Sequence, residues 1–178
     1  MKKSVMITLL AVVISLGCIV GGTIAWLADQ DTITNTFTVG DIQLVLSETT
    51  GDTYHMVPGA TLTKDPKLTV KKDSEDCWLF IQITTGNGAE DYLSYTVADG
   101  WTQLPGTTGV FYRQQAATLT DVSYFVLSHN TVTVKDSVTQ AQMATLTAEN
   151  YPKLTVTAYA VQYLHFPTPE AAWAQVTT

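Results

Sequence analysis

The sequence has few of the residues on which disulfide frameworks and metal sites depend. It contains two cysteines, Cys18 and Cys77, and three histidines in 178 residues. Cys18 lies in an apolar N-terminal run, so removal of that run would leave Cys77 alone and exclude an intramolecular disulfide. The mature domain would then depend on its core and sheets for stability. Cys77 opens the apolar run CWLFI, which predicts a buried, unreactive strand thiol.

Arginine is almost absent as well, since Arg113 is the only one. The formal net charge is -7, and loss of Lys2 and Lys3 with an N-terminal leader would bring it to -9. Such an acidic surface would repel nucleic acid and anionic lipid headgroups. We therefore expect no nucleic acid partner, and contact with a membrane only through the leader before it is cleaved.

Motifs of catalysis and metal binding are also missing. No HExxH pair occurs, no serine stands in a G-x-S-x-G elbow, and the acidic run at 73–76 lacks the glycine and final glutamate of an EF-hand loop. Three isolated histidines remain as possible zinc ligands from separate loops: His55, His129 and His165. We expect no catalytic residue, no metal and no cofactor, and we predict that the protein is not an enzyme.

The N-terminus carries the pattern of a secretory signal. Lys2 and Lys3 precede an uncharged, mostly apolar run over residues 5–20, and polarity returns at Asp29. We predict a signal peptide over residues 1–28, helical before cleavage, and a secreted chain that is one domain from residue 29 to residue 178. No anchoring tail is expected after Thr178.

Two positions supply the small residues that a signal peptidase needs, Ala25 and Ala28. Ala28 is slightly favoured, because polarity returns directly after it. Two other outcomes stay open. The apolar run at 5–27 is nearly long enough to span a bilayer uncleaved, and Cys18 stands near the end of the apolar run, where a lipoprotein signal places its modified cysteine.

The mature chain reads as short alternating runs separated by Gly, Pro and Asp turns, which predicts an all-β domain. The run at 77–85 is the most apolar and is expected at the centre of a sheet with both faces covered. Pro66 divides the run at 60–70, which indicates an edge strand or two short strands with a bulge. The expected strands cover 35–48, 60–70, 77–85, 92–97, 101–104, 109–114, 117–120, 123–127, 130–135 and 152–164.

Two short helices are expected among these strands. Ser137 and Gln140 have the spacing of a capping box, which predicts a helix over 137–146. Alanines and Trp173 favour a second helix at 170–176, which could lie over one end of the core.

The stretch at 21–40, GGTIAWLADQDTITNTFTVG, resembles the start of the TasA and camelysin family, and PGATLTKDP at 58–66 resembles the segment after the first strand of that family. The resemblance implies export by a Gram-positive bacterium and a leader cut by a SipW-type signal peptidase. It also implies a jelly-roll fold and, often, assembly into matrix fibres. We therefore expect an all-β fold, a jelly-roll-like antiparallel β-sandwich with one or two short helices.

One β-prone, proline-free segment follows the leader and is the candidate functional site. It is the possible donor strand, within an arm at 29–39: Asp31, Thr32, Ile33, Thr34, Asn35, Thr36, Phe37, Thr38 and Val39. Such a segment can pair with an exposed sheet edge of a neighbouring subunit. It can equally form the first strand of its own domain.

The function that these features predict is structural, in the extracellular matrix or at the cell surface, with self-association or other matrix proteins as partners. Two alternatives come from different classes. Camelysin-like relatives have been classed as metallopeptidases. A glycan- or protein-binding surface module is the other alternative, and four aromatic residues could line its face: Tyr92, Tyr95, Trp101 and Tyr112.

Overall fold

The structure is a computed structural model that describes residues 41–51 and 54–176. The predicted signal peptide, the cleavage positions Ala25 and Ala28 and the candidate donor strand at 31–39 lie outside these residues. Everything described belongs to one compact unit of the chain. No helix in the described ranges has the length and hydropathy needed to cross a membrane.

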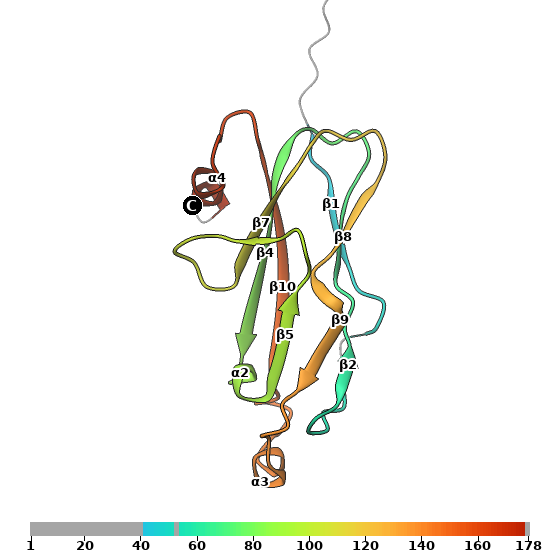
Figure 1. Ribbon diagram of the computed structural model, residues 1–178, viewed down its shortest axis with the longest axis vertical. Coiled ribbons are helices and arrows are strands. Elements are labelled where there is room, and N and C mark those ends of the chain that lie inside the picture. The colour runs from blue at the N-terminus through green and yellow to red at the C-terminus, as the bar shows by residue number, and fades with distance from the viewer. Residues whose placement is uncertain (1–40, 52–53, 177–178) are drawn as a thin grey trace, which may run out of the picture. The chain divides into compact units, whose positions relative to one another are not determined.

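The described residues form antiparallel sheets with three short helices (Figure 1). The helices are α2 (Ala89–Tyr92), α3 (Gln140–Ala144) and α4 (Pro169–Val176). The strands are β1 (Leu44–Ser47), β2 (Thr61–Thr63), β3 (Lys67–Val70), β4 (Cys77–Gly86), β5 (Leu93–Val97), β6 (Thr102–Gln103), β7 (Val110–Gln115), β8 (Val122–Phe125), β9 (Leu127–Val134) and β10 (Lys153–Gln162).

The strands make two layers. One layer is the sheet with the order β10-β4-β7-β6, and the other contains the sheets β1-β3-β8 and β2-β9-β5. These last two sheets continue into one another, because β2 precedes β3 and β8 precedes β9 along the chain. Backbone hydrogen bonds join them at the junction, from Lys64 N to Asn130 O (2.8 Å) and from Val126 N to Pro66 O (3.0 Å).

The pairing of distant strands is nested. The consecutive strands β2 and β3 pair with β9 and β8, respectively. The strands β4 and β7, which pair with each other, both lie between β3 and β8 in the sequence. Nesting of this kind is typical of a long hairpin wound into a jelly roll. The all-β, antiparallel, jelly-roll-like fold expected from the sequence is confirmed, with sheets that do not close into a barrel and with three short helices where one or two were expected.

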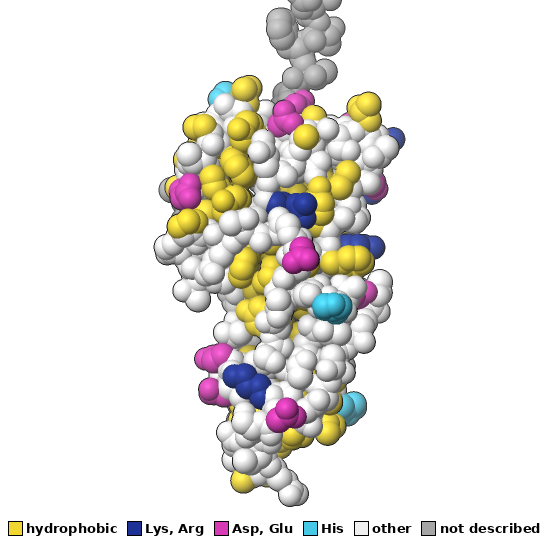
Figure 2. Space-filling model, viewed as in Figure 1, with side chains coloured by type: hydrophobic (Ala, Val, Ile, Leu, Met, Phe, Trp, Pro, Cys, Tyr) yellow, Lys and Arg dark blue, Asp and Glu magenta, His cyan; other side chains and the backbone are white. Residues whose placement is uncertain are grey.

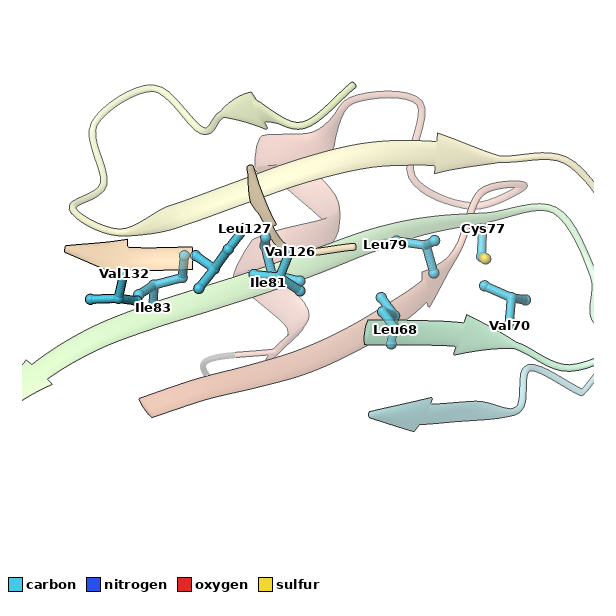
Figure 3. Packing of buried hydrophobic residues seen from close by; sticks show 9 residues of the cluster. All are labelled: Leu68, Val70, Cys77, Leu79, Ile81, Ile83, Val126, Leu127 and Val132. Atoms are coloured by element: carbon cyan, nitrogen blue, oxygen red, sulfur yellow. The ribbon is translucent and has the colours of Figure 1, made fainter. Parts of the chain in front are cut away.

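Strand β4 lies at the centre of its sheet, with β10 on one side and β7 on the other. Its side chains alternate between two apolar clusters, as the period of two in a strand requires. The inner cluster lies between the layers and contains Leu68, Val70, Cys77, Leu79, Ile81, Ile83, Val126, Leu127 and Val132 (Figure 3). The outer cluster contains Trp78, Phe80, Leu104, Val110 and Ala172. The central, doubly covered strand is confirmed.

The structure corrects three local predictions. Residues 60–70 form two short strands, as one interpretation had it, and only the first is at an edge: β2 is an edge strand, whereas β3 lies between β1 and β8. Residues 117–120 are not a strand and make a single bridge, from Thr118 to Ser74. The capping box of α3 uses Thr139 and Gln142, not Ser137 and Gln140, and the helix is correspondingly shorter.

The C-terminal helix also differs in position from the expectation. α4 packs against β10 and β4, where Ala172 is fully buried in the outer cluster. It therefore covers one face of a sheet and not an end of the core.

Candidate functional site: the open edge of β10

Strand β10 is the longest edge strand among the described residues. It pairs with β4 along ten residues, from Lys153 opposite Gly86 to Gln162 opposite Cys77, and no other described strand pairs with it. The other described edge strands are shorter, at two residues for β6 of the same sheet and three to five for β1, β2, β5 and β8 of the other sheets. The open edge of β10 is thus the largest unpaired stretch of backbone that the described sandwich offers.

The sequence of β10, KLTVTAYAVQ, explains why it forms a regular strand. Apolar residues alternate with threonine, so one face reaches the inner cluster through Leu154, Val156, Ala158 and Ala160. The other face reaches the outer cluster through Tyr159 and Val161. Both faces are therefore fixed by burial, which sets the register against β4.

The hydrogen bonds determine which backbone groups face the open edge. Tyr163 N donates to Asp76 O at 2.9 Å, one step beyond the pair of Gln162 with Cys77. In an antiparallel ladder, hydrogen-bonded and non-bonded residues alternate. Odd-numbered residues of β10 therefore bond to β4. The N–H and C=O groups that point to the open edge belong to Leu154, Val156, Ala158, Ala160 and Gln162.

The described strand β10 itself lacks the sequence features that usually block strand addition, although β1 of the other layer comes near it without pairing. Exposed edges are commonly protected by lysine, proline, bulges or a very short strand. In β10 the only charge is on Lys153, at its first residue, and the pairing register runs without a shift. The edge is therefore suited to accept a further strand.

The structure does not bring the three histidines together. His55 precedes β2, His129 lies within β9 with its ring Nδ1 2.9 Å from Ser128 Oγ, and His165 follows β10. Among residues 41–51 and 54–176, no three His, Cys, Asp or Glu side chains gather into a group that could hold a metal ion. The zinc site that a metallopeptidase would need does not fit the described residues, and we derive no step through a metal.

The acidic residues at 73–76 have local structural contacts. Asp76 Oδ1 accepts a hydrogen bond from the backbone N–H of Ala117 at 2.6 Å. Asp73 has a φ of 65°, and its N–H donates to Thr118 O at 2.7 Å. These bonds hold the segment after β3 against the segment after β7, which explains the single bridge between Ser74 and Thr118.

The four aromatic residues considered for a glycan-binding face do not share one face. Tyr112 belongs with the outer cluster, its ring 5.7 Å from that of Trp78. Tyr95 and Trp101 pack against the inner cluster. Tyr92 ends α2. The predicted common aromatic face is therefore wrong as a geometric arrangement.

The sequence reasoning missed the packing role of Arg113. Its guanidinium lies over the ring of Tyr124 at 3.5 Å and over that of Trp101 at 5.4 Å. Burial lowers the pKa of Arg113. Figure 2 shows Lys and Arg side chains scattered over the visible face without a basic patch. The single arginine therefore serves a cation–π stack rather than a surface for polyanions.

Cys77 is fully buried in the inner cluster. Burial raises the pKa of its thiol to about 11, and the nearby charge of Asp76 acts in the same direction. The thiol stays protonated at neutral pH, so the predicted buried strand thiol is confirmed.

The fold and this edge define an open antiparallel β-sandwich with one long strand edge unpaired among its described residues. The sequence model described as camelysin metallo-endopeptidase matches residues 1–79, which end in β4. This match confirms the resemblance to the TasA and camelysin family. Proteins of that family are typically extracellular or surface-associated. Comparison with curated proteins and with solved structures gives no match.

Proposed function

We propose that the protein is a secreted structural component of the extracellular matrix or cell surface, with no catalytic activity. Its subunits associate when residues 31–39 of one copy pair with the open edge of β10 in the next. The observation that carries this proposal is that edge, which is long, regular, free of proline and uncharged after Lys153.

The lengths and sequences of the two partners match. The donor strand has nine residues and the acceptor edge has ten. In DTITNTFTV, threonines alternate with Ile33, Asn35, Phe37 and Val39, so one face of the added strand would be mainly apolar. Main-chain hydrogen bonds would supply affinity, and the apolar face would supply specificity. Because donor and acceptor are different surfaces, the contact propagates head to tail and gives a filament.

Export comes first in this proposal. A SipW-type signal peptidase cuts after Ala25 or Ala28, which releases the chain from the membrane and frees the donor strand. Intact-mass measurement of the exported protein tests this step. A mature mass that begins at Trp26 or Asp29 is expected, whereas a full-length or lipid-modified mass contradicts it.

Assembly is tested by negative-stain microscopy of two chains, one from Asp29 and one from Gly40. Filaments are expected only from the chain that keeps the donor strand. If both chains stay monodisperse under all conditions, assembly by this route is wrong. If the longer chain is monomeric and more stable than the shorter one, residues 31–39 pair with their own domain.

A substitution in β10 tests the acceptor edge directly. Ala158→Pro removes an N–H that points to the open edge and not to β4, so the sandwich should survive while strand addition is blocked. Ala158→Val keeps the N–H and is the matched control, which should still form filaments. Filaments from both variants in equal yield would place the contact elsewhere.

The name of the matching family favours proteolysis as a second candidate. The test is hydrolysis of casein by the chain from Asp29, with and without a chelator. Hydrolysis that the chelator abolishes, and that is lost in one of the variants His55→Ala, His129→Ala or His165→Ala, would establish a metallopeptidase and contradict a purely structural role.

A further inference from the structure

A cavity of about 660 Å³ opens beside the first residues of β10. Its lining comes from both layers, with Leu62 of β2, Leu93 of β5 and Val132 of β9 on one side and Leu154 of β10 on the other. The space is within the range of pockets that hold small ligands in other proteins. It lies between the layers at the N-terminal end of β10, where β2 and β10 are both edge strands.

The lining combines apolar side chains with three basic residues. Lys64, Lys153 and His55 line the cavity, and among the described residues that line it none is an aspartate or a glutamate. Lys64 already forms an ion pair with Glu48 (2.9 Å). Among the described residues, no ion pair or side-chain hydrogen bond involves the Lys153 ammonium, which leaves it available to an anion.

Methionine supplies further evidence for a ligand site. The chain has four methionines, and the two that follow the leader, Met56 and Met143, both line this cavity. Methionine is flexible and polarisable, so it adapts to apolar ligands of varied shape. Met143 is half-buried on α3, a helix with no buried residue of its own, so that helix covers the cavity more than it contributes to the core.

We propose that this cavity binds a single-chain amphipathic anion of the fatty-carboxylate class. The alkyl chain lies between the layers against Leu62, Val132 and Leu154, and the carboxylate lies near the Lys153 ammonium. This inference does not depend on filament formation, because both layers of the cavity belong to one copy of the chain.

The chain from Asp29 to Thr178 is suited to the test. Both apolar clusters consist of residues after residue 41, so this chain keeps the whole core. With the leader removed and only the methionine methyl groups labelled, the NMR spectrum reports Met56 and Met143 alone, apart from an initiator methionine. Titration with octanoate, decanoate and dodecanoate below their micelle concentrations should shift both methyl signals saturably. Affinity should rise about fourfold for each added methylene.

Charge and lining are tested with matched variants. Lys153→Glu should weaken dodecanoate binding about fivefold while dodecanol binding stays unchanged. Lys72→Glu, at an exposed lysine beyond β3, is the charge control and should bind as the parent does. Met143→Ser should weaken the binding of both dodecanoate and dodecanol, whereas Ala144→Ser on the same helix should leave the binding of both unchanged.

Several outcomes overturn the inference. They are shifts that do not saturate, equal binding of dodecanoate and dodecyltrimethylammonium, or equal losses in the Lys153→Glu and Lys72→Glu variants. If the chain from Gly40 binds dodecanoate and the chain from Asp29 does not, the occupant of the cavity is the chain's own segment at 29–39 and not a fatty carboxylate. Microscopy of the same samples reports on assembly separately.

Discussion

The two faces of β4 are buried by different means. On the inner face, Leu79 and Ile81 are fully buried against aliphatic residues of β3 and β9, which come from the opposite layer. On the outer face, Trp78 and Phe80 are covered by aromatic side chains and by α4. One strand therefore joins a core made by two sheets to a smaller core made by a sheet and a C-terminal helix.

The difference lies in how firmly each cover is held. The inner cover is the second layer, with its own backbone ladders along β3 and β9. The outer cover is one helix of eight residues, held by ring contacts of Trp173 with Phe80 (5.2 Å) and Tyr159 (5.4 Å). A hydrogen bond from Trp78 Nε1 to Phe166 O (2.8 Å) holds the chain before it. The outer face should open at lower cost than the inner face.

The largest effect is expected from a cavity in the inner cluster. Ile81→Ala removes a fully buried side chain at the centre of β4 and should lower the free energy of unfolding by about 3 kcal/mol. Thr84→Ala, at an exposed position of the same strand, is the control and should change it by less than about 0.5 kcal/mol. Urea denaturation followed by circular dichroism measures both. A loss below about 1 kcal/mol for Ile81→Ala would show that the inner cluster is not the main core.

A smaller effect is expected at the outer face. Trp173→Ala removes the ring that covers Phe80 and Tyr159, but this ring is only half-buried, so a loss of about 2 kcal/mol is expected. Part of it should appear as local release of α4, seen as faster amide exchange in α4 than in β3 or β9. Gln175→Ala, exposed on the same helix, is the control. Equal rates of amide exchange in α4 and in β3 and β9 would contradict the inference that the outer face of β4 opens at lower cost than the inner face.

Acid should weaken the inner layer before the outer cover. Asp65 accepts hydrogen bonds from Thr49 N (2.9 Å) and Thr50 N (3.1 Å), as well as from both threonine hydroxyls, and so fastens the chain after β1. The side-chain bond from Thr49, then the backbone bond, holds the pKa of this carboxyl well below its ordinary value of 3.8. The ionised Asp65 carboxylate therefore stabilises the folded state at pH values above the unfolded pKa of 3.8. This stabilisation is lost as the pH falls below 3.8 toward the lower pKa of the folded state.

The measurement is the thermal midpoint between pH 6 and pH 2.5. Asp65→Asn should lower the midpoint by a few degrees at pH 6 and should flatten its decline below pH 4. Asp99→Asn, at an exposed aspartate, is the control. The outer cluster is held by apolar side chains, so the fluorescence of Trp78 and Trp173, measured in a Trp101→Phe background, should change later in the titration than amide signals of β1. If the tryptophan fluorescence and the amide signals of β1 change at the same pH, the second layer and α4 unfold together.

The sequence predicted the parts of the fold that depend on local alternation. In β4 and β10 each residue's face follows from its neighbours, so the central strand at 77–85 and the strand at 152–164 were predicted correctly. Local patterns failed where a distant contact decides the outcome. The segment at 117–120 is held by Asp76 and by its bridge to Ser74, so its alternating residues do not make a strand.

The helix at 140–144 shows a competition between two similar signals. Ser137 and Thr139 each precede a glutamine by three residues, and the structure uses Thr139 because Val138 is buried before the helix begins. The open edge of β10 and the cavity could not be predicted from the sequence. An edge is defined by which strand lies beside it, and the cavity lining is brought together from β2, β5, β9, β10 and α3.

The smallest effect concerns thiol reactivity, which compares the two covers of β4 through one buried position in each. Cys77 is buried under the second layer, and with a pKa of about 11 only about one thiol in a thousand is ionised at pH 8. Ala172 is equally buried, but it lies on α4 itself, on the side that faces the sheet. In a Cys77→Ala background, Ala172→Cys should react with iodoacetamide at least about tenfold faster than Cys77 does in the parent, because local release of one helix exposes it. Unfolded samples of both should react at the same rate. Equal protection in the folded state would mean that α4 is held as firmly as the sheets, and that both faces of β4 open only when the whole sandwich unfolds.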